Sequence, residues 1–176
     1  AGPVTAGAVI LDPGRPISGL NDSKKLSESK RLKLESVIKS QALAWGIGWV
    51  SAAEIDEINI REATFLAMQR AIDSLESKPD EIVIDGNALP ASLTAPARAL
   101  VGGDAIEPAI SAASILAKTG RDRLMVELCA EYPGYGFSKH KGYGTQLHAD
   151  ALARLGPSAI HRHSFAPVAK ARLEIG

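Results

Sequence analysis

Apolar and polar residues alternate along the chain in patterns that predict strands and helices following one another. The first pattern is a β-branched run at residues 4–11, which stops at the turn-forming sequence Asp12-Pro13-Gly14. Similar or continuously apolar runs predict three more strands, at residues 43–50, 81–85 and 97–101.

Between these strands, apolar residues recur at the spacing of a helix. Ser27 is positioned to cap a first helix, and after a short acidic helical turn at 52–57 Asn59, with Glu62 three residues later, opens a second that ends before Pro79. A long helix is predicted from 108 to 131, stopped by Pro133. A loop at 132–144 and a helix ending at Leu155 follow, and the tail beyond is predicted to be irregular.

Interleaved strands and helices define an α/β domain with an appended helical region. At 176 residues and 45% hydrophobic, the chain is long enough to bury a core, and no apolar run approaches the ~20 residues that span a bilayer. Cys129 has no partner for an internal disulfide. These features argue against membrane insertion and predict a reducing, cytoplasmic setting.

Charge is unevenly distributed although the formal net charge is zero. Lysines and arginines outnumber acids in segments 22–39 and 139–170, and all four histidines fall in the second segment. Acids predominate in 51–110. The two basic segments are either solvated helix faces or surfaces that bind phosphate.

Asp85 and Asp104 are the first candidates for chemistry. Asp85 ends a buried apolar strand, where ligands of α/β sheets bind, although it could instead form an Asx turn with Gly86 or Asn87. Asp104 follows two glycines and precedes Glu107 by three residues, which also fits a helix-capping box. Clustered carboxylates are the ligands that Mg²⁺ and Mn²⁺ prefer.

Several sequence blocks, in order, resemble the signature blocks of bacterial ribonuclease HII. They are residues 21–27 (Asn-Asp-Ser-Lys-Lys-Leu-Ser), 84–87 (Ile-Asp-Gly-Asn), 111–118 (Ser-Ala-Ala-Ser-Ile-Leu-Ala-Lys), 140–144 (His-Lys-Gly-Tyr-Gly) and 161–165 (His-Arg-His-Ser-Phe). The resemblance implies a ribonuclease H-like fold, with a mixed β-sheet flanked by helices in residues 1–131 and a substrate-binding helical extension in 132–176. It also implies an endoribonuclease that cleaves the RNA strand of RNA–DNA hybrids and incises duplex DNA at embedded ribonucleotides.

The same resemblance assigns roles to individual residues. Asp85 and Asp104 match two of the family's four metal-binding acids, so the implied cofactor is Mn²⁺ or Mg²⁺. Tyr143 matches the tyrosine that stacks on the sugar at the RNA-to-DNA step. Lys24, Lys25 and Lys141 would contact phosphates without reading bases. Taken singly, these side chains could also be an ordinary loop tyrosine and plain surface lysines.

The family's opening block, an Asp-Glu pair and a Gly-Arg-Gly loop, has no counterpart before Ala1. We therefore expect a first strand and two metal-binding acids to be missing, as in a fragment of a longer enzyme. A chain that truly began at Ala1 would be a catalytically incomplete hybrid-binding module. Smaller departures are Gly102, where relatives often have Lys, and His163, where they often have Arg.

The mechanism expected for the complete protein is hydrolysis by two divalent ions ~3.5–4 Å apart, giving 5′-phosphate and 3′-hydroxyl ends. The histidines lack zinc-ligand spacing and are expected at the surface near phosphate. Cys129 has no evident base, and no Gly-x-Ser-x-Gly turn is present. A phosphotransferase acting on a small substrate is a weaker alternative, and the protein is expected to be a monomer.

Overall fold

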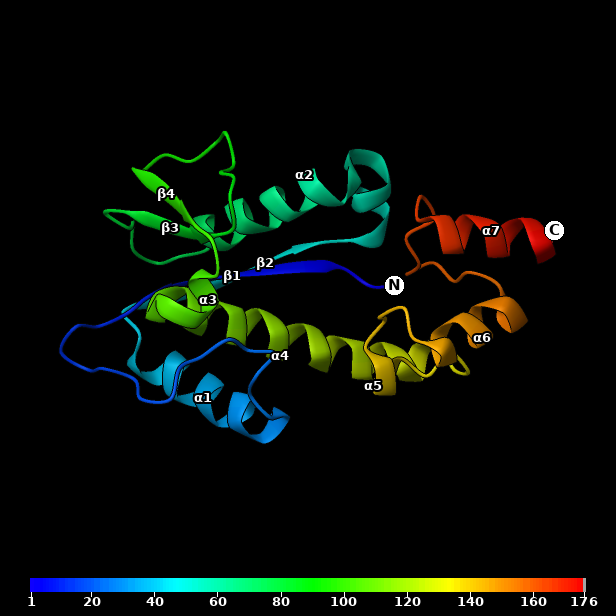
Figure 1. Cartoon of the computed structure of the whole chain (residues 1–176), viewed down its shortest axis with the longest axis horizontal. Helices are drawn as coiled ribbons and strands as arrows, with labels where there is room; N and C mark the ends of the chain where they lie inside the picture. Colours follow the sequence, from blue (N-terminus) through cyan, green and yellow to red (C-terminus); the bar gives the residue numbers. More distant parts are fainter. Residues whose placement is uncertain (176) are drawn as a thin grey trace. The chain divides into compact units, whose positions relative to one another are not determined.

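The computed structural model describes residues 1–175, and their order confirms most of the predicted elements (Figure 1). Strands and helices alternate in the first part of the chain and helices alone occupy the last part. The elements are β1 (Val4–Ile10), α1 (Glu28–Gln41), β2 (Ala44–Val50), α2 (Ala52–Asp73), β3 (Ile82–Asp85), β4 (Ala97–Leu100), α3 (Gly103–Ile106), α4 (Pro108–Glu131), α5 (Phe137–His140), α6 (Gln146–Leu155) and α7 (Ala166–Ile175).

The described chain divides into two compact units that do not follow the sequence order. One unit, here called the sheet unit, comprises residues 5–49 and 64–119. The other, the helical unit, comprises residues 1–4, 50–63 and 120–176. The boundary expected between residues 131 and 132 is therefore not where this division falls, because α2 and α4 each contribute turns to both units.

Within residues 1–175, the strands of the sheet unit pair as two two-stranded sheets, β1 with β2 and β3 with β4. The second pair is parallel, with Ile82 opposite Ala97 and Asp85 opposite Leu100. Ile82 and Ile84 are buried, whereas Asp85 is exposed at the strand end. The burial of alternate residues is what fixes the direction of the Asp85 side chain.

The core of the sheet unit joins α1 to the first half of α4. Ile38, Ile115 and Leu116 are fully buried there, with residues of β1 and β2 packed against them. Strand β1 approaches α4 so closely that a Cβ on Gly7 would overlap the carbonyl oxygen of Ala113. A Cβ on Gly48 of β2 would likewise overlap the carbonyl oxygen of Ala67 in α2. Glycine at both positions permits this close packing.

Helix α2 contains the break that the sequence predicts. Asn59 has a φ of 68°, and its Oδ1 accepts hydrogen bonds from the backbone N–H groups of Arg61 (2.9 Å) and Glu62 (3.2 Å). Asn59 thus ends the acidic turn and caps the helix that follows. In residues 1–175, no helix is both long and apolar enough to cross a membrane.

The predicted irregular tail is wrong, because residues 166–175 form α7. Val168 and Ala171 on this helix pack against Leu152 of α6. The segment just before this helix is held by Asp56, whose carboxylate accepts hydrogen bonds from the backbone N–H groups of His163 (2.7 Å) and Ser164 (2.8 Å). This acid lies more than 100 positions away in the sequence, so a local pattern could not reveal it.

Candidate functional site

Asp85 lies at the exposed end of β3. Its Oδ1 accepts a hydrogen bond from the backbone N–H of Gly103 at 2.9 Å, across from the neighbouring strand. The N–H of Gly86 instead donates to the carbonyl of Leu100 at 3.1 Å and so extends the parallel pairing. The Asx-turn alternative for Asp85 is not what the structure contains. The carboxylate is held at the end of the β3–β4 pair by the start of α3.

Asp104 lies in the first turn of α3, on the segment that follows β4. The N-cap position belongs to Gly102, which has a φ of 70°, and Glu107 follows the helix as its C-cap. The capping-box alternative for Asp104 is therefore wrong. The hydroxyl of Ser111 donates to the carbonyl oxygen of Asp104 at 2.7 Å, which ties this acid to the first turn of α4.

The electrostatics of Asp104 show that the acids of this region face one another. Its pKa is raised, first by burial and then by the negative charges of Asp85 and Asp22, while Lys24 acts in the opposite direction. The structure thus brings together both sequence-predicted acids and adds Asp22. Asp22 was missed because it lies in a basic loop and follows no strand. The sequence signal for it was its place in the block 21–27, two residues before Lys24.

These side chains fit a divalent cation as part of a ligand set. Carboxylate oxygens suit Mg²⁺ and Mn²⁺, and a cation between Asp85 and Asp104 would relieve the repulsion that, in addition to burial, raises the pKa of Asp104. Within residues 1–175, no three His, Cys, Asp or Glu side chains are arranged to hold a metal together. Asp85 and Asp104 therefore supply two acidic side chains to a cation, not a complete cage.

The loop that carries Lys24 and Lys25 is anchored to α4, the helix to which Ser111 ties the main chain of Asp104. Ser23 is buried, and its hydroxyl shares a hydrogen bond of 2.7 Å with the hydroxyl of Ser114 in α4. The Arg31 guanidinium donates to the carbonyl of Ser23 at 3.1 Å, and the N–H of Lys24 donates to the Asp22 carboxylate at 2.9 Å. The two lysine side chains are exposed and available to phosphate.

Tyr143 and Lys141 belong to the helical unit, in the loop between α5 and α6. The Tyr143 side chain is 53% exposed, and the Arg121 guanidinium lies over its ring at 5.1 Å from the centroid. Arg121 also donates to the carbonyl of Lys141 at 2.8 Å. The ammonium group of Lys141 bonds the carbonyl of Ser138, so this lysine is half-buried and less free than Lys24 or Lys25.

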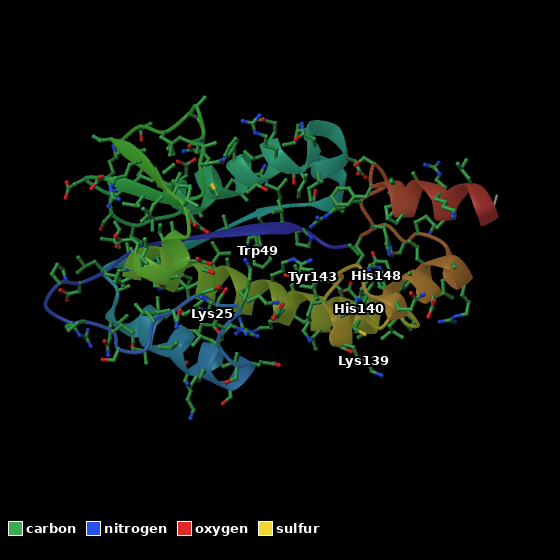
Figure 2. The ribbon with its side chains drawn as sticks, viewed as in Figure 1. Lys25, Trp49, Lys139, His140, Tyr143 and His148 are labelled. Atoms are coloured by element: carbon green, nitrogen blue, oxygen red, sulfur yellow. The ribbon has the colours of Figure 1, made fainter. Side chains whose placement is uncertain are left out.

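Three of the four histidines are not at the surface, contrary to the expectation. His140, His148 and His161 are buried among the rings of Tyr135 and Phe137. Figure 2 shows His140 and His148 beside Tyr143. The histidine spacing does not match one helix face, so the cluster could not be recognised from periodicity. Flanking aromatic residues were the only sequence signal that these imidazoles belong to a core.

An α/β fold with two acids at the end of a parallel strand pair, next to a lysine loop, defines a class of metal-dependent nucleases. Solved structures share this fold. The chain superposes on ribonuclease H2 from Pyrococcus horikoshii with a TM-score of 0.82, at 25% identity over 98% of this chain and 90% of that one. It also shares the fold of Bst-RNase HIII in complex with Mn²⁺, with a TM-score of 0.72 at 16% identity over 99% of this chain and 65% of that one.

The family model for ribonuclease HII matches residues 1–168. Ribonuclease HII from Hyphomonas neptunium is 59% identical over 96% of this chain and 88% of its own length. The protein of that name from Halorhodospira halophila is 57% identical, with 96% and 86% covered. The chain belongs to the ribonuclease HII family. It is a metal-dependent endoribonuclease that acts on RNA–DNA hybrids, as the resemblance between sequence blocks predicted.

Proposed function

We propose that Asp85 and Asp104 hold the Mn²⁺ or Mg²⁺ with which the protein cleaves the RNA strand of hybrids and incises duplex DNA at single embedded ribonucleotides. The observation that carries the proposal is the position of both acids at the end of the β3–β4 pair: the N–H of Gly103, one residue before Asp104, donates to the Asp85 carboxylate at 2.9 Å, and the Asp85 charge adds to burial in raising the pKa of Asp104. Two carboxylates that repel each other when bare favour a shared cation. A purely structural pair would instead be neutralised by a permanent basic partner.

Each acid is positioned by the backbone of a neighbouring element. The Gly103 N–H orients the Asp85 carboxylate, and the Ser111 hydroxyl fixes the main chain at Asp104. When bound, divalent metal activates water and stabilises the charge of the leaving 3′-oxygen. Hydrolysis then forms a bond from the water oxygen to phosphorus and breaks the P–O3′ bond, leaving a 5′-phosphate and a 3′-hydroxyl.

Nucleic acid is bound by side chains that do not read bases. Lys24 and Lys25 are exposed on the anchored loop and would contact phosphates, as would Lys141 once it leaves its bond to Ser138. Tyr143 would stack on the sugar at the RNA-to-DNA step, with Arg121 supporting its ring. Selectivity for RNA then comes from duplex shape and the 2′-hydroxyl. We propose that the protein works as a monomer in a reducing cytoplasm.

The test is cleavage of a DNA duplex containing one ribonucleotide, with Mn²⁺ or Mg²⁺, by the chain and its Asp85→Asn variant. Asp80→Asn is the matched control, because Asp80 is an exposed acid of the same unit that precedes β3, whereas Asp85 ends it. We expect cleavage by the chain and by Asp80→Asn, and none by Asp85→Asn. Unchanged activity of Asp85→Asn would overturn the ligand assignment.

The same assay can also refute the proposed cleavage. Tight, salt-dependent binding of the duplex by the chain, without cleavage in either metal, would overturn it.

A further inference from the structure

A cluster of three buried imidazoles, here called the histidine cluster (His140, His148 and His161), lies in the helical unit and has no part in the proposed chemistry. The rings of His140 and His148 are stacked with centroids 4.5 Å apart. The Nε2 atoms of His148 and His161 are 3.1 Å apart. His161 has no exposed surface. Such a group of titratable side chains is costly to bury unless each nitrogen has a partner.

The neighbours of His148 and His161 fix where each proton lies. His148 Nδ1 faces the carbonyl oxygen of Tyr143 at 2.9 Å and must therefore donate. In a neutral imidazole its Nε2 then accepts, so His161 Nε2 is the donor of the bond between them. His161 Nδ1 in turn accepts from the backbone N–H of Ser158 at 2.9 Å, and the Ser158 hydroxyl lies 2.8 Å away. A chain of hydrogen bonds runs from Ser158 through both imidazoles to Tyr143.

His140 holds the other side of the same loop. Its Nε2 lies 2.8 Å from the carbonyl of Tyr135 and donates to it, and its Nδ1 accepts from the N–H of Gly142 at 3.1 Å. The N–H of Tyr143 donates to the carbonyl of His140 at 2.9 Å. Both backbone groups of Tyr143 are therefore bonded to histidines of the cluster.

The loop that the cluster holds is strained. Lys141 has a φ of 51° and Gly142 a φ of 79°, so two successive residues adopt the left-handed conformation, the first of them with a side chain. A non-glycine residue in that conformation persists only where the surroundings over-determine it. The hydrogen bonds to His140 and His148, together with the Arg121 contact to the Tyr143 ring, supply that determination.

The imidazoles of His148 and His161 are neutral near pH 7. Burial lowers the pKa of His161 to about 4 and also lowers the pKa of His148. The titratable groups that lie near them are His163 and the other imidazoles, and each of these disfavours a further positive charge. The guanidinium groups of Arg121 and Arg162 lie against residues 1–3 of the same unit.

We propose that His148, relayed by His161 and assisted by His140, is a positioning residue that fixes Tyr143 in the orientation in which its ring meets the substrate sugar. The inference rests on the proposed role of Tyr143. The contacts of the cluster end on the backbone of Tyr143 itself and not merely on a neighbouring core residue. The cluster therefore acts through Tyr143 and does not touch the reacting atoms.

The test is a double-mutant cycle between His148 and Tyr143, measured on the duplex with one ribonucleotide. His148→Leu removes the donor to Tyr143, whereas His148→Asn keeps an amide N–H near the position of Nδ1. We expect His148→Leu to lower kcat/KM about 10-fold, as for one lost buried hydrogen bond, and His148→Asn to restore most of it. In a Tyr143→Ala background, His148→Leu should lower it less than about 2-fold further.

An equal loss in both backgrounds would overturn the inference, because it would mean that His148 only stabilises the fold. No loss in a folded His148→Leu variant would overturn it as well. If His148→Leu does not fold, Ser158→Ala takes its place in the cycle, since Ser158 is partly exposed and its hydroxyl lies at the far end of the relay. A 2- to 3-fold loss, about that of a weakened bond, is then expected only when Tyr143 is present.

NMR of the imidazole nitrogens tests the hydrogen-bond geometry independently of enzymatic activity. We expect the proton of His148 on Nδ1 and that of His161 on Nε2, unchanged between pH 7.5 and 6. Any other tautomer would overturn the inference even in an active enzyme. A chain that shows these tautomers but does not cleave the duplex would instead refute the proposed function.

Discussion

The acidic centre of the sheet unit and the Tyr143 loop of the helical unit are built in opposite ways. Asp85 and Asp104 are held through single backbone contacts, face one another as like charges, and lie partly in solvent. Tyr143 is half-exposed, but its backbone carbonyl accepts from the buried ring of His148 and its N–H donates to the backbone carbonyl of the buried His140. The first region leaves electrostatic strain for a cation to relieve, whereas the second is pre-organised before any ligand arrives.

The largest expected effect comes from removing a charge in the acidic centre. Asp104→Asn should lower kcat by about 1,000-fold, because the proposed metal ligand would be lost and with it several kcal/mol of charge stabilisation. The same change should raise the melting temperature slightly in the absence of metal, since it removes the repulsion from Asp85 and Asp22. Cleavage kinetics and thermal unfolding without added metal check both. A variant that is inactive and also less stable would contradict the account of strain.

The Tyr143 loop should be less sensitive. Tyr143→Ala is expected to lower kcat/KM about 10- to 100-fold, the value of one stacking contact, and Tyr143→Phe to remain near the starting activity because it keeps the ring. Steady-state cleavage of the single-ribonucleotide duplex measures this. Equal losses in both variants would show that the hydroxyl, and not the face of the ring, makes the contribution to kcat/KM.

The two units should also respond differently to acid. The folded state lowers the pKa of His161 from about 6.5 to about 4, so the unfolded chain binds the proton more readily between these values. The contribution of His161 to the free energy of unfolding is therefore complete above pH 6.5. It is lost as the pH drops towards 4, by on the order of 3 kcal/mol from this group alone. Amide exchange at pH 7 and pH 5 should show α5 and α6 losing protection before β3 and β4. Uniform loss across both units would contradict the prediction.

The smallest expected effect concerns the lysine loop. Lys24→Ala and Lys25→Ala should each weaken binding of an RNA–DNA hybrid 2- to 5-fold and reduce the salt slope of log Kd by about one counterion. Lys78→Ala is the control, because Lys78 is equally exposed but lies in the acidic segment. Affinity measured between 50 and 200 mM salt tests this. A matching change for Lys78→Ala would remove the lysine loop from the interface.

Most elements were predictable because their signals are local. Ser27, Asn59 and Pro133 mark helix boundaries by capping or by lacking an N–H, and α4 begins and ends where the pattern predicts. Asp85 was found because a strand end points its side chain outwards. These features depend on residues a few positions apart, which a sequence displays directly.

The features that could not be predicted depend on contacts between distant residues. The segment that leads into α7 is held by Asp56, and Asp22 comes near Asp104 only in the folded chain. The histidine cluster brings together His140, His148 and His161 from three separate segments. Its hydrogen-bond donors and acceptors depend on contacts that sequence spacing does not reveal. The positions of such residues are set by tertiary packing, not by propensity.

The parallel pairing of β3 with β4 involves four residues on each strand, and most of β4 is exposed or half-exposed. A ladder this short can open on its own well before the cores of α1 and α4 separate. Because Asp85 ends one strand and the chain to Asp104 leaves the other, such an opening would take the two acids apart while most of the protein stays folded. Heating should therefore abolish the cleavage activity at temperatures where the spectrum of the protein is still that of the native state.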